Sequence, residues 1–352
     1  MNELFMPAFE QNAEFDGNSS VQPVLSVVVI GRNEGQRLAR CLESIARIKT
    51  VGAKEVIYVD SASTDCSAEL ASKYGALSIT IHPERPTAAV ARNTGWRRAT
   101  SDLILFLDGD TVLHPDFPKV ACDALLKDES IAAVWGHRRE MYPDESIFNR
   151  VLDLDWIYQP GPTEFCGGDV LMRRIALVET GGFDDGLIAG EEPELCRRIR
   201  ARGFTILHID EPMTLHDLGI KHWSQYLKRA MRAGYAYAEI SGRFRDSDDA
   251  FWSSEQRANI LRCSFWAISF AAAGIASVRF GAIPFAFWFT LLLVLSLRSA
   301  WRARWKSDDL VTLLLFGIHS QLQQIPIFIG QLKYAFDRKR RSRSGLIEYK
   351  TN

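Results

Sequence analysis

Cysteine is scarce in this sequence, and the arrangement of the few cysteines excludes two ways of stabilising a fold. No pair has the C-x-x-C spacing of a structural zinc site. A secreted disulfide framework is equally unsupported, so the cysteines indicate a reducing compartment. The six cysteines are Cys41, Cys66, Cys122, Cys166, Cys196 and Cys263.

An excess of charge of either sign is also missing. The chain has 42 Lys and Arg residues against 43 Asp and Glu residues, which leaves a net charge of −1. Nothing in this balance predicts a nucleic acid as a partner. Residues 1–22 carry acidic groups and lack the apolar segment of a signal peptide, so we interpret them as a flexible leader.

Long apolar runs are absent from the first two thirds of the chain but present in the last third. The segments "CSFWAISFAAAGIASV" (263–278) and "FGAIPFAFWFTLLLVLSL" (280–297) each approach the roughly 20 residues that a membrane-spanning helix needs. A buried helical hairpin of a soluble domain is the alternative interpretation. The density of aromatic residues and the near absence of charge favour two membrane helices.

A third apolar run, residues 310–332, is followed by a basic tail at 337–352. The basic loop 298–309 is expected in the cytoplasm, because basic loops stay on the inner side of a membrane. If the third run crossed, the basic tail would lie outside. We therefore predict that this run lies in the membrane interface or re-enters without crossing.

The part of the chain before these runs alternates between strand and helix patterns. Strand patterns occur at 24–30, 54–60, 77–81 and 103–108, and amphipathic helix patterns lie between them. This alternation predicts an α/β domain with a mixed, mostly parallel sheet over 23–217. It would be followed by amphipathic interfacial helices over 218–260 and by membrane helices over 261–336.

Polar residues follow the predicted strands at the points where each strand ends. Asn33 and Glu34 follow the first strand, and Asp108 and Asp110 follow the fourth. In parallel sheets, ligands bind beyond the carboxyl ends of the strands. Two neighbouring carboxylates repel each other unless a cation lies near, and Mg²⁺ or Mn²⁺ bound there would neutralise a diphosphate leaving group.

Six ordered motifs between about residues 24 and 235 resemble glycosyltransferase family 2, the inverting enzymes with the GT-A nucleotide-sugar fold. They are "VVVIGRNEG", "VDSASTD", "AVARNTG", "LDGD", "FCGGDVLMRRIALVETGGFDD" and "GEEPELCRRIRARGF". A G-x-G-x-x-G motif and a phosphate loop with a following Lys are both absent, which argues against a dehydrogenase and a nucleotidyltransferase. The full Q-x-x-R-W element of processive synthases is also absent, which favours single-sugar addition.

The resemblance implies roles for the residues at the strand ends. The donor nucleotide would lie against residues following the first two strands, with Asp60 at the base. Arg92 would approach the donor diphosphate, and Asp108 would hold ribose or sugar hydroxyls. The expected nucleotide-binding residues are Asn33, Glu34, Asp60, Ser61, Asp65, Arg92 and Asp108. Helix capping is the alternative role for Asn33 and Asp65.

The resemblance also implies a metal site and a catalytic base. Asp110 would bind Mg²⁺ or Mn²⁺ together with Asp108, and His216 would be a third ligand or a diphosphate contact. A solvated turn is the alternative for Asp110, and a structural role is the alternative for His216. Glu192 occupies the position of the family's base, which is usually Asp, and Glu191 is its rival. Both glutamates also suit a helix N-terminus, where they would complement the helix dipole.

Two further pairs of residues are expected near the acceptor or the diphosphate. Gly168 and Asp169 belong to the "FCGGDV" motif, and Arg229 and Arg232 belong to a basic, aromatic-rich segment at 222–239. An ordinary basic helix is the alternative for that segment. An interfacial helix whose cations face lipid headgroups or pyrophosphate is preferred.

The sequence thus predicts a membrane-bound enzyme that uses a nucleotide-sugar donor, with a UDP-sugar favoured over a GDP-sugar. Its acceptor would be lipid-linked, such as a polyprenyl-diphosphate sugar for a surface polysaccharide. The catalytic domain would lie on the cytoplasmic side of a bacterial inner membrane and contact membrane lipids. A catalytically silent nucleotide-sugar-binding scaffold is the alternative.

Overall fold

The computed structural model describes residues 25–49, 54–247 and 249–340. The predicted leader 1–22 and residues 341–352 of the predicted basic tail lie outside this part of the chain. The chain divides into two compact units. Of the described residues, 25–49, 54–141 and 158–218 form the sheet unit, and 142–157, 219–247 and 249–340 form the helical unit.

A nine-stranded mixed sheet forms the centre of the sheet unit, with the strand order β3-β2-β1-β4-β8-β6-β9-β5 and with β7 paired to β9. Parallel pairing joins β3, β2, β1 and β4 and also joins β6 to β9, whereas the remaining pairs are antiparallel. The predicted mixed, mostly parallel sheet is therefore confirmed. The strands are β1 (Leu25–Gly31), β2 (Lys54–Asp60), β3 (Leu77–Thr80), β4 (Leu103–Asp108), β5 (Thr111–Leu113), β6 (Ile131–Glu140), β7 (Gly161–Thr163), β8 (Val170–Arg173) and β9 (Thr205–His216).

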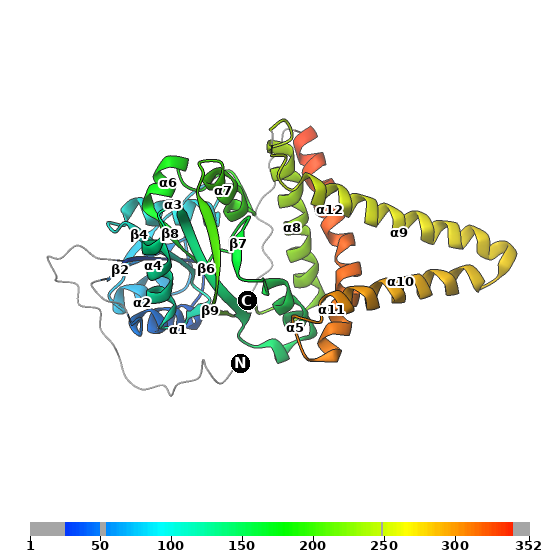
Figure 1. Ribbon diagram of the computed structural model, residues 1–352, viewed down its shortest axis with the longest axis horizontal. Helices are drawn as coiled ribbons and strands as arrows, with labels where there is room; N and C mark the ends of the chain where they lie inside the picture. Colours follow the sequence, from blue (N-terminus) through cyan, green and yellow to red (C-terminus); the bar gives the residue numbers. More distant parts are fainter. Residues whose placement is uncertain (1–24, 50–53, 248, 341–352) are drawn as a thin grey trace. The chain divides into compact units, whose positions relative to one another are not determined.

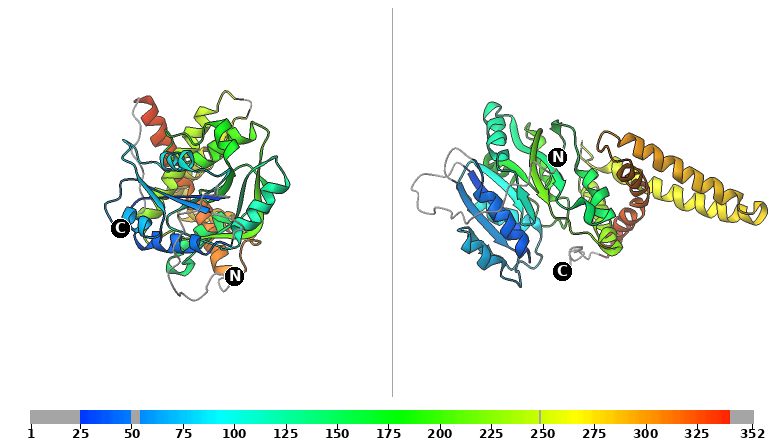
Figure 2. Two further views of the ribbon diagram at one scale, coloured as in Figure 1. Left: turned by 90° about the vertical axis from the view of Figure 1, so that its left-hand side faces the viewer. Right: turned by 90° about the horizontal axis from the view of Figure 1, so that it is seen from below.

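Helices cover both faces of this sheet (Figures 1 and 2). The chain moves outward from β1 to β3 and then returns to β4 on the other side of β1. Because crossovers between parallel strands are right-handed, α3 lies on the opposite face from α1 and α2. The helices of this unit are α1 (Gln36–Ala46), α2 (Ser67–Lys73), α3 (Ala88–Arg98), α4 (Phe117–Lys127), α6 (Arg174–Thr180) and α7 (Glu191–Arg200).

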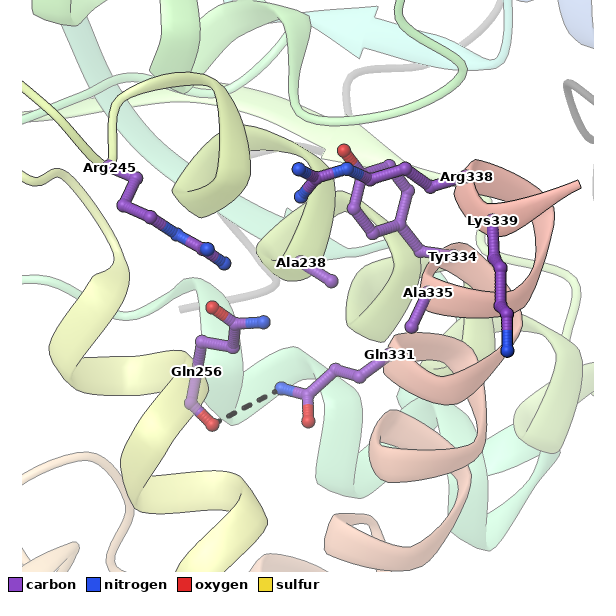
Figure 3. Close-up of a pocket in the computed structure, with 8 residues that line it drawn as sticks. All are labelled: Ala238, Arg245, Gln256, Gln331, Tyr334, Ala335, Arg338 and Lys339. Atoms are coloured by element: carbon purple, nitrogen blue, oxygen red, sulfur yellow. Dashed lines mark hydrogen bonds between the residues drawn. The ribbon is translucent and has the colours of Figure 1, made fainter. Parts of the chain in front are cut away.

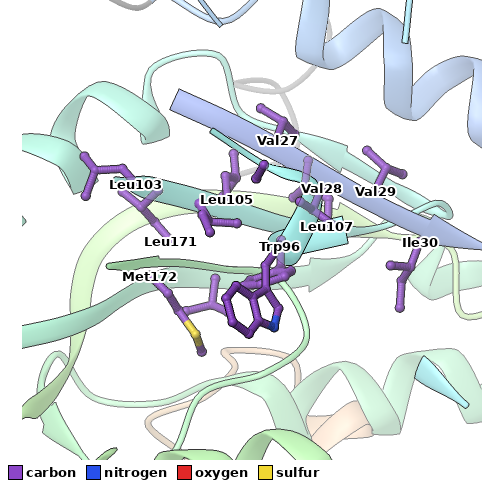
Figure 4. Packing of buried hydrophobic residues seen from close by; sticks show 14 of the residues in the cluster. Val27, Val28, Val29, Ile30, Trp96, Leu103, Leu105, Leu107, Leu171 and Met172 are labelled. Atoms are coloured by element: carbon purple, nitrogen blue, oxygen red, sulfur yellow. The ribbon is translucent and has the colours of Figure 1, made fainter. Parts of the chain in front are cut away.

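The core of the sheet unit lies between the central strands and the helices that cover them. Val27 to Ile30 on β1 are at most 7% exposed, because parallel strands are buried on both faces (Figure 4). Trp96 packs into the same cluster from α3. A Cβ atom on Gly95 would lie 2.2 Å from Cγ1 of Val28, so α3 can approach β1 this closely only because residue 95 is glycine.

The helical unit contains the apolar runs of the sequence. Helices α9 and α10 run side by side as a hairpin, and α8, α11 and α12 gather at its base (Figures 1 and 2). Three helical stretches, Ser253–Phe280, Ile283–Arg302 and Leu310–Lys339, are long and apolar enough to cross a membrane. The helices are α5 (Ile147–Asp153), α8 (Trp223–Arg243), α9 (Ser253–Phe280), α10 (Ile283–Arg302), α11 (Leu310–Leu322) and α12 (Gln324–Lys339).

Small residues allow the helices of this unit to pack closely. A Cβ atom on Gly234 of α8 would lie 1.9 Å from the carbonyl oxygen of Ile327 on α12, and one on Gly330 of α12 would lie 2.0 Å from that of Met231. Such close backbone approach at glycine is typical of membrane-protein helices. The backbones of α8 and α12 therefore come into direct contact at these two glycines.

The segment Tyr142–Ile157 belongs to the helical unit although it lies between β6 and β7 in the chain. The ring of Phe148 contacts that of Trp223, with centroids 4.9 Å apart. Nζ of Lys306 donates a hydrogen bond of 2.7 Å to the carbonyl oxygen of Leu154. The predicted domain 23–217 includes this segment, because the residues that the segment contacts lie far away in the chain.

Candidate active site

The ends of three parallel strands bring the predicted polar residues to one edge of the sheet. Gly31 at the end of β1 is paired with Asp60 at the end of β2, and Ile30 is paired with Asp108 at the end of β4. The loops that follow these strands therefore leave the sheet side by side. This register explains why residues far apart in the sequence meet here.

Asp60 is almost fully buried, with 1% of its surface exposed, and holds the loop that follows β2. Its Oδ2 accepts a hydrogen bond of 2.8 Å from the backbone N–H of Ser63, and its Oδ1 accepts one of 3.1 Å from the hydroxyl of Tyr58. Burial and the neighbouring Asp60 carboxylate raise the pKa of Tyr58 well above its usual range. The proposed contact of Asp60 with a nucleobase stays a prediction.

Asn33 connects the loops after β1 and β2. Its side-chain oxygen accepts a 2.7 Å hydrogen bond from the backbone N–H of Thr64, and its own N–H donates to Oγ of Ser63 over 2.8 Å. Asn33 has a φ of 56°, a left-handed conformation that Asn tolerates better than most residues. The helix after β1 is capped by Gly35, so Asn33 organises a loop and does not cap α1.

The other residues expected near the nucleotide lie around these two loops. Oδ1 of Asp65 accepts a 3.0 Å hydrogen bond from the N–H of Ser67, the first residue of α2, but the N-cap position of this helix is Cys66 and no side chain caps it. Ser61 is buried, and its N–H donates to the carbonyl oxygen of Gly31. Glu34 forms an ion pair of 3.0 Å with Arg37. Nucleotide contacts by these residues stay predictions.

Asp108, Asp110 and His216 come together as the resemblance implies. Each offers a ligand atom, and these atoms lie within 4.8 Å of one another. Strand β5 begins directly after Asp110 and pairs with β9, which sets Thr111 opposite His216 and brings the imidazole to the carboxylates. Nε2 of His216 lies 3.3 Å from Oδ1 of Asp110. Two carboxylates and an imidazole form a donor set that fits Mn²⁺ or Mg²⁺.

Arg92 of α3 lies at the centre of the remaining carboxylates. Its Nη2 lies 2.9 Å from Oδ1 of Asp108, and its Nη1 lies 3.0 Å from Glu191 and 2.9 Å from Glu192. Burial lowers the pKa of Arg92, but Glu192, Asp108 and Glu191 outweigh this effect and raise that pKa above its ordinary value. Arg92 is therefore always positively charged and pairs with three acidic side chains. Its expected contact with the donor diphosphate stays a prediction.

Glu191 and Glu192 are the first two residues of α7, after Gly190 in a left-handed conformation with φ 81°. The side chain of Glu192 is 16% exposed, and that of Glu191 is 6% exposed. Burial and the charge of Glu191 raise the pKa of Glu192 to about 7, against the lowering effect of Arg92. A carboxylate with a pKa near neutrality is suited to accept a proton from a hydroxyl group.

Gly168 and Asp169 support this cluster from the loop before β8. A Cβ atom on Gly168 would lie 2.4 Å from Nη2 of Arg92 and 3.0 Å from Oδ2 of Asp108, so a larger residue would displace the cluster. Oδ1 of Asp169 accepts a 3.0 Å hydrogen bond from the N–H of Asp108, and Oδ2 accepts one of 2.8 Å from the hydroxyl of Thr214. Asp169 therefore ties the end of β4 to β9, two residues before His216.

Two residues of the site were not among the sequence candidates. Arg138 on β6 lies 3.8 Å from both Oδ2 of Asp108 and Oδ2 of Asp169, and no motif in the sequence distinguishes it. The side chain of Asn93 donates hydrogen bonds of 2.7 Å to the carbonyl oxygen of Phe183 and to Oδ1 of Asp185. Asn93 thereby holds the loop that leads to α7, and its position in the "AVARNTG" motif is the signal that pointed to it.

Arg229 and Arg232 lie on α8 in the helical unit. Both are partly buried, on a helix that packs against α12. Their expected contact with an acceptor or a diphosphate therefore stays a prediction.

Comparison with known proteins agrees with this geometry. Residues 26–174 match the family "Glycosyl transferase family 2". Glycosyltransferase AglE from Haloferax volcanii is 22% identical over 234 residues, which cover 63% of this chain and 75% of AglE. Poly-beta-1,6-N-acetyl-D-glucosamine synthase from Staphylococcus aureus is 24% identical over 197 residues, which cover 52% of this chain and 47% of that protein. Other curated relatives are matched over 33% to 42% of their own length.

A solved structure shares the fold over nearly the whole chain. Mannosyltransferase PcManGT from Pyrobaculum calidifontis, in complex with GDP-Man and Mn²⁺, has a TM-score of 0.66 and 18% identity, with 94% of this chain and 92% of that chain covered. At this level of identity, the similarity shows the fold alone. The chain thus shares a GT-A-like fold with this structure, and its residues 26–174 are similar to glycosyl transferase family 2.

Proposed function

We propose that this protein is a membrane-bound, inverting, metal-dependent glycosyltransferase that moves a sugar from a nucleotide-sugar donor to a lipid-linked or polysaccharide acceptor. The observation that carries the proposal is the arrangement around Arg92. One buried guanidinium holds both a carboxylate of the metal-ligand triad, Asp108, and the carboxylate suited to act as base, Glu192. The diphosphate leaving group would thus lie near Asp108 and the attacking hydroxyl near Glu192, within one cluster of side chains.

The donor would bind at the strand ends, with its base near Asp60 and its diphosphate near the triad of Asp108, Asp110 and His216. A divalent cation held by these three residues would supply positive charge to a diphosphate leaving group. The presence of GDP-Man and Mn²⁺ in the structure of PcManGT supports a nucleotide-sugar donor and a divalent ion. The motif resemblance favours a uridine nucleotide, so both bases belong in the test.

Glu192 would act as the general base. It would accept the proton of the acceptor hydroxyl as the hydroxyl oxygen attacks the anomeric carbon from the side opposite the diphosphate, which inverts the configuration at that carbon. Arg92 would keep the Glu192 carboxylate oriented without protonating it, because the guanidinium donates hydrogen bonds but does not titrate in this range. The N-terminus of α7 fixes the backbone of Glu192.

The acceptor is proposed to be lipid-linked because the helical unit exposes large apolar side chains along α9 and α10. Ile268, Ile275 and Phe287 are each at least 69% exposed, as expected for side chains that face lipid tails. A polyprenyl-diphosphate sugar in a bacterial inner membrane is the acceptor that suits a catalytic unit on the cytoplasmic side. Membrane lipids are then permanent partners of α9 and α10.

A donor panel tests the proposal. Membranes that contain the protein are mixed with UDP- and GDP-sugars and a lipid extract, and release of nucleoside diphosphate is measured with Mn²⁺ or Mg²⁺ and with a chelator. We expect release from one donor, dependent on the metal and on the lipid extract, and at least a hundredfold loss in Asp110→Asn. Donor binding without any turnover on any acceptor would instead favour the catalytically silent scaffold.

A further inference from the structure

A cavity of about 320 Å³ lies wholly within the helical unit, where the end of α8, the beginning of α9 and the last turns of α12 meet (Figure 3). We call it the α12 pocket. It shares no residue with the candidate active site. The residues that carry its chemistry are Arg245, Gln256, Gln331, Tyr334, Arg338 and Lys339.

The α12 pocket is strongly cationic. Arg245, Arg338 and Lys339 line it, and none of the described residues that line it carries a carboxylate. The guanidinium groups of Arg245 and Arg338 point toward one another across the pocket (Figure 3). Like charges that face each other repel, so this arrangement favours an anion between them. Two acidic residues of α8 and α12, Glu239 and Asp337, are paired with other cations, at 2.9 Å to Arg243 and 3.4 Å to Lys333. Asp246 and Glu255 adjoin Arg245 and Gln256 in the chain but do not line the pocket.

The uncharged polar residues Gln331 and Tyr334 at the base of the pocket are held in place by hydrogen bonds and by ring packing. Gln331 is buried, and its Nε2 donates to the carbonyl oxygen of Gln256 while its Oε1 accepts a 3.3 Å hydrogen bond from Asn259. The ring of Tyr334 packs edge-to-face on Tyr235, with centroids 5.3 Å apart. A planar guanidinium above fixed amide and hydroxyl groups is a combination that recognises phosphate.

The place of the α12 pocket along α9 favours the phosphate of a membrane lipid over a free phosphate in solution. Gln256 lies about 10 Å along the helix before the apolar stretch that begins at Cys263. If that stretch enters the roughly 30 Å hydrocarbon core, the α12 pocket lies at the depth of the headgroups. Basic residues at this depth attract anionic lipids. On α12 itself, Leu332 and Phe336 are 53% and 52% exposed and offer apolar contact beside the cations.

We propose that the α12 pocket binds the phosphate of an anionic membrane lipid, with Arg245, Arg338 and Lys339 around the phosphate and the lipid tails beside α9 and α12. The bound lipid would join the ends of α8 and α12 to the start of α9. This proposal goes beyond the transfer reaction and concerns a second site on the same chain.

Native mass spectrometry of the delipidated full chain in detergent tests this site. Phosphatidylglycerol is titrated against phosphatidylcholine, and we expect the wild type to bind one phosphatidylglycerol preferentially. The triple variant R245Q/R338Q/K339Q should lose about tenfold or more of this affinity. The matched variant R302Q/R304Q/R340Q removes the same charge from exposed cations outside the pocket and should stay close to the wild type.

Three results would overturn the proposal. They are equal loss of affinity in both triple variants, no preference for phosphatidylglycerol, and displacement of the lipid by millimolar inorganic phosphate, which would identify a free-anion site. If the triple variant fails to fold, R338Q and R338K replace it, with R338K expected to retain more affinity because it keeps the charge. The readout involves no sugar, so a failure of the proposed transferase activity would leave this result unaffected.

Discussion

At the scale of single residues, the adjacent glutamates at the start of α7 differ in their surroundings. Nη1 of Arg92 contacts both carboxylates, but Glu191 is nearly enclosed whereas Glu192 retains an exposed part. A base must reach an acceptor that arrives from outside. We therefore keep Glu192 as the proposed base and Glu191 as its alternative.

Replacing Glu192 with Gln should abolish transfer while donor binding persists. The amide keeps the size of the side chain but cannot accept the proton, so we expect a loss in kcat of roughly 10²–10⁴-fold. Calorimetric titration of the donor in the presence of metal should give an affinity close to that of the wild type. Glu191→Gln is the matched control and should retain more activity. Full turnover by Glu192→Gln would assign the base to another residue.

The pH dependence of the reaction gives a second test at this scale. Because the pKa of Glu192 is raised to about 7, the base is protonated below that pH, and kcat/KM should rise as the pH increases through this range. A bound divalent cation adds positive charge and would place the midpoint at or below this value. The negative charge of Glu191 raises the pKa of Glu192, so Glu191→Gln should shift the rising limb to lower pH. An unchanged limb in that variant would contradict the assignment.

At the scale of elements, the contact between α8 and α12 depends on glycine. Gly234→Ala would set a Cβ atom 1.9 Å from a backbone oxygen of α12, and backbone atoms cannot move aside as a flexible side chain can. We expect a destabilisation of roughly 1–3 kcal/mol or more, measured as a lower thermal midpoint in detergent.

Gly274→Ala on α9 is the matched control. A Cβ atom there would meet only Cζ of Phe285, at 3.9 Å, which is ordinary contact. Alanine also favours helix over glycine by about 1 kcal/mol, so this variant should be neutral or stabilising. Equal midpoints for the two variants would show that the close approach of α8 and α12 does not contribute to stability.

Contacts between elements also explain why the proposed metal ligands and the proposed base lie in one site. Asp169 links the N–H of Asp108 on β4 to the hydroxyl of Thr214 on β9, and Asn93 of α3 holds the loop that leads to α7. Each link crosses from one element to another. The positions of Asp108, His216 and Glu192 therefore depend on residues that would not contact the substrate.

At the scale of the whole molecule, the number of membrane crossings decides on which side the chain ends. In the apolar 18-residue window of Leu310–Lys339, 39% is buried, whereas 11% is buried in the corresponding windows of the other two stretches. The second half of Leu310–Lys339 packs on α8, which carries Lys228, Arg229 and Arg232 and is too polar for a hydrocarbon core. We keep the prediction that α9 and α10 cross and that α11 and α12 remain in the interface.

Alkaline phosphatase inserted at two positions tests this topology, because the reporter is active only outside the cytoplasm. An insertion at Gly281, between α9 and α10, should be active, and one after Arg340 should be inactive. Cytoplasmic green fluorescent protein at the same two positions should give the opposite pattern. Phosphatase activity after Arg340 would show that the third stretch crosses.

The sequence by itself determined the strands, the helices between them and the polar residues that follow each strand. These features depend on local patterns: the apolar runs Leu25–Gly31 and Leu103–Asp108 became buried strands, and Asp108 and Asp110 followed the second of them. The apolar runs in the last third of the chain could also be identified from the sequence, because a hydrophobic stretch of membrane-spanning length consists of consecutive residues.

Only the tertiary structure decided which of these residues meet. Arg92 was expected at a diphosphate, but its guanidinium lies among three carboxylates that are separated from it by 16 to 100 positions in the chain. Arg138 lies in the site although no sequence motif predicts it there. Tyr142–Ile157 likewise belongs to the helical unit without a sequence motif that predicts this. Local patterns decide how a segment folds, whereas strand register and helix packing between distant segments decide which side chains come into contact.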